Sequence, residues 1–229
     1  MIKGIGMLEV VIALTLSLGI LTIVLSTVSE SARQTKKITS GQQRLEGIFR
    51  TVDTIKSDLG KCGMRLQEAS RLFALPMFER FETGFKLNFG SGSETLLANA
   101  YKGDLVLRTA ANDYFQKDKM ILVYNAEADV FEFNQIATTA NGDLTLKNKL
   151  KSDYLPGSVA VVYKQVEYKY FAGQQIIKRK SDRGSFQPLL EEVTDFFVTF
   201  FPESKSVLYR IEVNRKEQIR GYIFLINMV

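Results

Sequence analysis

Hydrophobic residues follow three successive patterns along the chain. Residues 10–28 carry no charge, and their only polar side chains are hydroxyls. From Leu45 to Phe73 apolar residues recur at steps of three and four, and from Phe85 onward the period shortens to two. These patterns predict an apolar helix, then an amphipathic helix, then a series of β-strands.

The apolar run is long enough to cross a membrane. Its polar members are Thr15, Ser17, Thr22, Ser26 and Thr27, and each hydroxyl can donate to a carbonyl one turn earlier in a helix. The run has 19 residues, within the ~17–25 that span a bilayer as an α-helix. The other dense apolar run, residues 196–201, is far too short. We therefore predict one membrane-spanning helix.

The amphipathic segment continues this helix. Its apolar stripe consists of Leu45, Ile48, Val52, Ile55, Leu59, Cys62, Leu66, Ala69 and Phe73. The stripe could mark a coiled coil, but Gly47, Gly60 and Gly63 weaken a free-standing helix, so we expect one face to lie on the protein's own sheet. Gly41 allows a bend, and Pro76 ends the helix at the latest.

The rest of the chain predicts an antiparallel sheet. Candidate strands are residues 85–89, 105–109, 120–124, 130–135, 144–147, 159–171, 175–180, 196–201, 207–214 and 222–227. Asn141-Gly142 is the strongest hairpin turn, and residues 189–193 read as a short helical connector. We expect Tyr163, Tyr168 and Tyr170 to be core or half-buried, with ligand stacking as the alternative. The fold class is α+β, a long N-terminal helix packed on antiparallel sheet.

Residue types needed for common catalytic and metal sites are missing. The chain has no histidine and one cysteine, Cys62, which excludes Ser/His/Asp and Cys/His catalytic sets and an internal disulfide. We expect Cys62 to be a small buried side chain. Asp104, Asp113 and Asp118 lie in loops without the pattern of a calcium-binding loop. We therefore expect no enzyme activity, no cofactor and no metal site.

The net charge of +5 is concentrated in one segment. Residues 33–71 hold nine basic and four acidic side chains, so this segment alone supplies +5. A basic helix beside a membrane can meet anionic headgroups or the acids of a neighbouring subunit. Nucleic acid is a third and less favoured partner, because no aromatic cluster accompanies the cations.

A carboxylate, Glu9, immediately precedes the apolar run. At the bilayer centre such a charge costs roughly 2.5–3.5 kcal/mol, and less near the interface, so a positive partner is expected. If the chain is cut after Gly4, the new amine of Ile5 lies one helical turn from Glu9.

Lys3-Gly4, four uncharged residues, Glu9 and an apolar helix resemble the prepilin leader of type IV pilins and type II secretion pseudopilins. The resemblance implies that a prepilin peptidase cuts between Gly4 and Ile5 and N-methylates Ile5. It makes Glu9 the fifth mature residue, which acts in assembly. The sequence departs from the family at Ile5, usually Phe or Met, and at Gly6, often Thr or Ser. A cut after Gly6 is the alternative, and it would make Glu9 the third mature residue.

A second likeness concerns the C-terminal half. A tyrosine strand, a turn, a basic strand, Leu189-Leu190-Glu-Glu-Val193 and two late strands resemble PilW-type minor pilins and J-type minor pseudopilins in order. Asp58-Leu59-Gly60-Lys-Cys-Gly63 is similar to the end of the helix in PilW-type chains. This likeness covers about 60 residues and ranks subfamilies within the family.

The resemblance implies a leader at residues 1–4, a transmembrane helix at 5–28, an amphipathic continuation at 29–75 and a β-rich domain at 76–229. It implies a single-pass protein of the bacterial inner membrane, with its domain in the periplasm or outside the cell, part of a pilus or pseudopilus after assembly. The implied partners are other pilins or minor pseudopilins. Charge counting opposes this orientation, because Arg33, Lys36 and Lys37 follow the span. The alternatives are a signal-anchored binding domain outside the cytoplasm and a DNA-uptake pilin.

Overall fold

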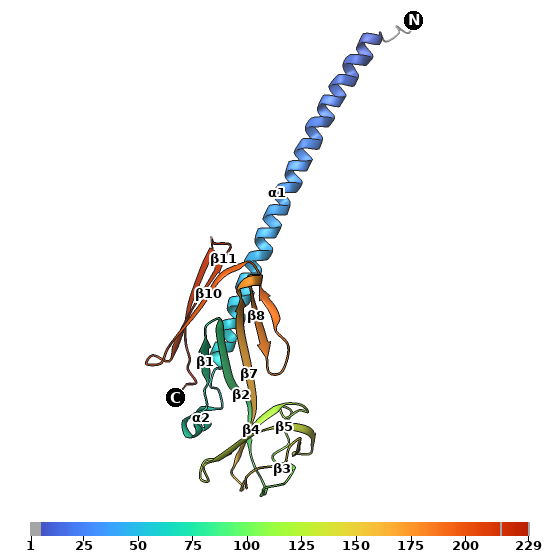
Figure 1. Ribbon diagram of the computed structural model, residues 1–229. Coiled ribbons are helices and arrows are strands. Elements are labelled where there is room, and N and C mark those ends of the chain that lie inside the picture. Colours follow the sequence, from blue (N-terminus) through green and yellow to red (C-terminus); the bar gives the residue numbers. More distant parts are fainter. Residues whose placement is uncertain (1–5, 216, 229) are drawn as a thin grey trace. The chain divides into compact units, whose positions relative to one another are not determined.

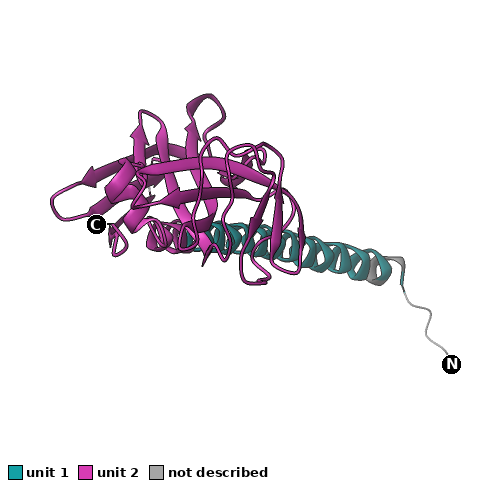
Figure 2. Cartoon of the chain, turned by 90° about the horizontal axis from the view of Figure 1, so that it is seen from below, with its two compact units in different colours: residues 1–50 teal, residues 51–229 magenta. Residues whose placement is uncertain are grey.

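The structure is a computed structural model that describes residues 6–215 and 217–228, apart from the side chains of residues 7–9. It contains two compact units, residues 1–50 and residues 51–229, which are coloured separately in Figure 2. Helix α1 (Met7–Lys61) begins in the first unit and ends in the second. The fold class is α+β, as the sequence predicts: an apolar N-terminal helix whose end packs on antiparallel sheet (Figure 1).

In the first unit, α1 is continuous through Gly41, where the sequence allows a bend. The predicted hydroxyl bonds are all present. Thr15 donates to the carbonyl of Val11 at 3.1 Å and Ser17 to that of Ala13 at 2.7 Å. Thr22, Ser26 and Thr27 bond to carbonyls three or four residues earlier in the same way. The polar atoms of the apolar run are therefore satisfied within the helix itself.

The predicted single helix reaching toward Pro76 is wrong. Helix α1 ends at Lys61, a turn follows, and a separate helix α2 (Gln67–Phe73) ends at Ala74 in the left-handed conformation. Gly63 has φ +74°, and a Cβ placed on it would lie 2.3 Å from Sδ of Met77 and 2.7 Å from the carbonyl oxygen of Asn227. The close approach of Met77 and Asn227 leaves no room for a side chain at position 63, and the left-handed backbone of Gly63 is incompatible with a continuing helix.

The larger sheet is built around a central strand. Its members are β1 (Phe78–Phe81), β2 (Gly84–Thr95), β3 (Val106–Arg108), β4 (Met120–Asn125), β5 (Val130–Ala140), β6 (Asp143–Leu146), β7 (Val159–Phe171), β8 (Ile176–Ser181) and β9 (Gln187–Leu190). Strand β7 pairs with β2, β4 and β8, and a short 3₁₀ turn η1 (Ala172–Gln174) connects it to β8. All these pairings are antiparallel. Strand β7 thus joins the part of the sheet next to α1 to the lobe formed by β3–β6 (Figure 1).

The smaller sheet has the order β10 (Val193–Phe201), β11 (Ser206–Val213) and β12 (Glu217–Phe224). Its inner face meets the larger sheet through aromatic contacts. The ring of Phe196 lies 6.1 Å from that of Phe85, and Phe200 lies 5.0 Å from Phe78. The stripe residues Val52, Ile55, Leu59 and Cys62 are buried, which confirms that this end of α1 packs on the protein's own sheet.

Two strands were missed from the sequence. Strand β1 has no alternating apolar pattern, and β9 occupies part of the segment predicted as a helical connector. Leu190 is buried and pairs with Ile177 of β8. Backbone pairing with the edge of β8 therefore stabilises an extended conformation of β9, although the five residues 189–193 have a helical pattern. The predicted hairpin is confirmed: Asn141 and Gly142 both have positive φ and join β5 to β6.

We expect substitution by alanine to have opposite effects on the free energy of unfolding at two glycines of this region, Gly63 and Gly60. We expect Gly63→Ala to lower the free energy of unfolding by about 1–2 kcal/mol through its left-handed backbone, and further through the contacts above. Gly60 is helical, and a Cβ there meets no described atom within 4 Å, so Gly60→Ala should raise stability by up to about 1 kcal/mol. Denaturant unfolding of the full chain in detergent measures both. Equal effects would contradict the assigned helix end.

Candidate functional site

The residues predicted for processing, Gly4 and Ile5, lie outside the described residues. Glu9 is the third residue of α1, and its side chain is not described. The proposed pairing of the Ile5 amine with Glu9 therefore stays a prediction from the sequence. A carboxylate in the first turn gains roughly 0.3–1 kcal/mol from the helix dipole when it is exposed, less than the ~2.5–3.5 kcal/mol cost at bilayer centre. The dipole alone does not offset this charge in hydrocarbon.

The apolar surface of α1 is exposed on every side. All side chains of residues 10–28 are exposed, including Ile20 at 63% and Ile23 at 66%. Among the described residues, α1 is the helix long and apolar enough to cross a membrane. An uncovered apolar surface of this size is typical of an interaction or membrane site, and α1 is compatible with a single-pass membrane anchor.

A buried carboxylate holds the other end of α1 to the sheet. Asp58 accepts a hydrogen bond from the hydroxyl of Tyr168 at 2.6 Å and one from Nε of Arg179 at 2.7 Å. Nζ of Lys61, one turn further along α1, lies 3.6 Å from its other oxygen. Tyr168 comes from β7 and Arg179 from β8, so one carboxylate connects the helix to two strands.

Burial makes this cluster structurally important. The Asp58 side chain is 5% exposed and that of Arg179 is 30% exposed. Burial lowers the pKa of Arg179, but the hydrogen bond and charge of Asp58 raise it, and the net shift is upward. The guanidinium therefore stays charged. Burial and the neighbouring Asp58 also raise the pKa of Tyr168, which keeps its hydroxyl as a donor.

Sequence reasoning found only part of this cluster. Asp58 was noted as the first residue of the segment that resembles PilW-type chains, and Tyr168 was expected in the core, where it is fully buried. The pairing with Arg179 was missed. The available signal was an acid on the apolar face of a helix, since Asp58 adjoins Leu59 and lies three residues after Ile55.

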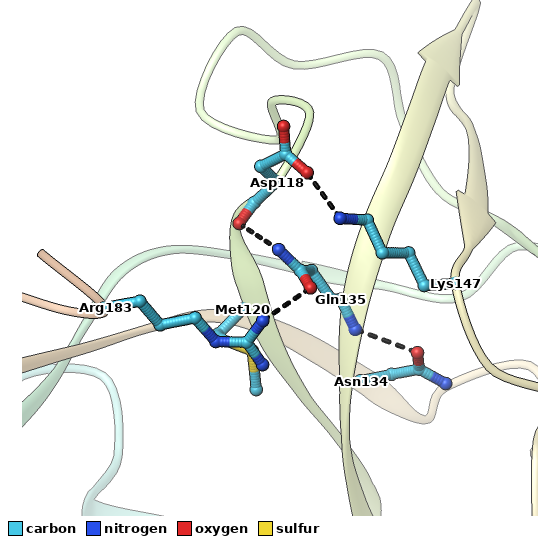
Figure 3. Close-up of polar contacts among 6 residues, drawn as sticks. All are labelled: Asp118, Met120, Asn134, Gln135, Lys147 and Arg183. Atoms are coloured by element: carbon cyan, nitrogen blue, oxygen red, sulfur yellow. Dashed lines mark hydrogen bonds and ion pairs between the residues drawn. The ribbon is translucent and has the colours of Figure 1, made fainter.

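Asp118, one of the loop acids considered for calcium, is engaged in other contacts. Asp118 accepts a hydrogen bond from Nζ of Lys147 at 2.6 Å, which lowers the pKa of its carboxyl group (Figure 3). The carbonyl of Asp118 accepts from Gln135 at 2.9 Å, and Gln135 in turn accepts from Arg183 at 2.7 Å. Figure 3 also shows Met120 and Asn134 beside this network, which joins the loop after β8 to β4 and β5. In the described part of the chain, no three potential acidic, cysteine or histidine ligands gather.

The single cysteine has the buried environment expected from the sequence. Sγ of Cys62 donates to the carbonyl of Met77 at 3.2 Å. Burial raises the pKa of the Cys62 thiol to about 12. The thiol is therefore protonated at neutral pH and is a poor nucleophile.

No family model and no curated protein matched this chain in comparisons with known proteins. The structure itself shows two features of α1: the uncovered apolar length of residues 10–28 and the buried ion pair of Asp58 at its other end.

The Asp58 cluster predicts an asymmetric effect of removing its two charges. Arg179→Met leaves an almost fully buried carboxylate with only Tyr168 and Lys61 as partners, so we expect a loss of up to about 3–5 kcal/mol in the free energy of unfolding. Asp58→Asn should cost less, because the partly exposed guanidinium of Arg179 can reach water. The double variant should cost less than the sum of the single effects. Denaturant unfolding of the full chain measures all three, and strict additivity would contradict a direct pair.

Proposed function

We propose that the chain is a minor pilin or pseudopilin subunit that assembles into, or primes, a type IV pilus or a type II secretion pseudopilus. A prepilin peptidase of the bacterial inner membrane removes residues 1–4 and methylates Ile5. The processed subunit remains anchored in that membrane with its β-rich domain in the periplasm, and it assembles with other pilins or pseudopilins. The observation that carries the proposal is an acid at residue 9 followed by a helix that is apolar on every side.

The uniform apolar surface supports this proposal over a fixed helix–helix contact. A helix that packs permanently on one partner needs only an apolar stripe, whereas a helix apolar all round suits a membrane span or a buried core. A filament subunit has to occupy both environments in turn, first lipid and then the packed helices of neighbouring subunits. Residues 10–28 present apolar side chains in every direction, and their hydroxyls are bonded internally.

The charge pair supplies the specificity that apolar packing lacks. Cutting after Gly4 creates an ammonium group at Ile5, which can meet Glu9 of its own chain or of the preceding subunit. In low dielectric such a pair is strongly favoured once formed, and an unpaired member costs about 3–5 kcal/mol. Where the pair joins two subunits, axial displacement of one of them would separate the charges. The pair therefore sets the axial register of assembly.

The alternative is a signal-anchored domain that binds a ligand outside the cytoplasm, in which Glu9 has no role. Among the described residues no metal-ligand cluster favours it. The two proposals differ in the state of the amino terminus, which can be measured directly.

The proposal predicts that the amino terminus is cleaved and methylated. Protein isolated from cells that contain a prepilin peptidase should lack residues 1–4 and carry one methyl group on Ile5, as measured by intact mass and peptide mass spectrometry. Gly4→Leu should block the cut, because it removes the small residue before the cleaved bond. Gly6→Leu is the matched control and should still be processed. A chain that retains Met1 in such cells would support the signal-anchored alternative.

The proposal also predicts that Glu9 is needed for assembly but not for processing. Glu9→Ala should insert and be cut normally, because neither step needs the pair, but its incorporation into filaments should fall on the order of a hundredfold or more. Glu30→Ala is the matched control, since Glu30 lies on the same helix beyond the apolar run and is exposed. Immunoblots of the membrane and sheared-filament fractions measure both steps. Equal incorporation of the two variants would exclude the proposed pair.

A further inference from the structure

Strand β12 is an open edge of the smaller sheet. Within the described residues it pairs with β11 alone, so along residues 218–224 no second strand pairs with the backbone N–H and C=O groups of its other side. Natural edge strands are usually short or blocked by proline or several charges. Strand β12 has eight residues, Glu217 to Phe224, and contains no proline. It therefore has the length and composition to accept another strand.

The same edge carries exposed aromatic side chains. Tyr222 is 50% exposed and Phe224 is 60% exposed, and their ring centroids lie 5.1 Å apart. Phe201 of β10 lies on the same face but two strands away from this edge, with its ring 6.4 Å from that of Tyr222, and it is not part of the pairing surface. An apolar patch at an unpaired sheet edge is characteristic of an association surface.

We propose that β12 pairs with β12 of a second copy of this chain, antiparallel and about a two-fold axis at Gly221. The strand is self-complementary about this residue. Ile219 then lies opposite the partner's Ile223, and Arg220 lies opposite the partner's Tyr222. Each contact occurs twice. The first joins two β-branched apolar side chains, and the second places a guanidinium against an aromatic ring.

Charge and side-chain size select this register over its neighbours. A pairing centred on Arg220 would place two guanidinium groups opposite each other, which is unfavourable. A pairing centred on Tyr222 would set Ile223 opposite the partner's Gly221 and lose the isoleucine contact. In the structure, the guanidinium of Arg220 bonds only to Gln218, at 3.1 and 2.7 Å, and among the described residues it has no carboxylate partner. It is available to meet the partner's ring.

This dimer is independent of the filament proposal. A two-fold contact closes on itself, whereas a filament contact repeats along a screw axis. The β12 pair is thus a closed form of unassembled subunits, and failure of the filament proposal would leave it untouched.

Complementary cysteines test the register in the full chain in detergent micelles. Gln218 lies opposite the partner's Phe224, so Gln218→Cys and Phe224→Cys chains should form a disulfide-linked dimer when mixed and oxidised. Either variant alone should stay unlinked, because identical positions are six residues apart along the strands, about 20 Å. The native Cys62 is buried and unreactive, and the unmodified chain controls for it.

Non-reducing gels give the result. A mixed-variant dimer supports the proposal. No dimer, or equal cross-linking of one variant with itself, overturns it.

Sedimentation in detergent tests the surface without new cysteines. Tyr222→Lys acts twice across the axis, so we expect the dimer Kd to rise roughly tenfold or more. Phe201→Lys is the matched control on the same face but on β10, and it should leave the Kd unchanged. Circular dichroism confirms the fold of both variants. A wild-type chain that stays monomeric, or an equal effect of the two variants, overturns the proposal.

Discussion

The uncovered apolar surface of α1 is the constraint on which the rest of the molecule depends. Residues 10–28 place apolar side chains in all directions, and the described part of the chain does not cover them. Water is therefore not a suitable environment for this half of the helix. The unit of residues 51–229 has its own buried core, so the chain combines one segment whose apolar side chains are uncovered with one whose apolar side chains are largely packed inside.

The Asp58 cluster fixes the end of α1 to the β-rich domain. A continuous helix is an effective connection between anchor and domain only if its end is fixed to the domain. Apolar packing of Ile55 and Leu59 provides affinity but little directional preference. The short bonds from Tyr168 and Arg179 to Asp58 require one rotation and one axial position of α1 against β7 and β8. After the turn at Gly63 the chain continues through α2 into the first strands of the sheet.

In our proposal, a charge pair sets the position of the helix at each of its two ends. At one end, the observed pair of Asp58 and Arg179 fixes the helix to its own domain. At the other end, the proposed pair of Glu9 and the Ile5 amine fixes it to a neighbouring subunit. In each case apolar surface supplies most of the free energy, and a charge pair in low dielectric sets the register. Pairs of this kind are effective because an unmatched buried charge is costly.

The sequence by itself determined the features that depend on local pattern. The apolar run, its internally bonded hydroxyls, the stripe through Leu59 and the Asn141-Gly142 hairpin all follow from residues within a few positions of one another. The tertiary structure decided the rest. Asp58 meets a guanidinium 121 residues away, and β9 is extended because β8 offers it an edge. Helix α1 ends at Lys61, two residues before Gly63, which Asn227 contacts closely. Such outcomes depend on which distant segments become neighbours, and no local period encodes that.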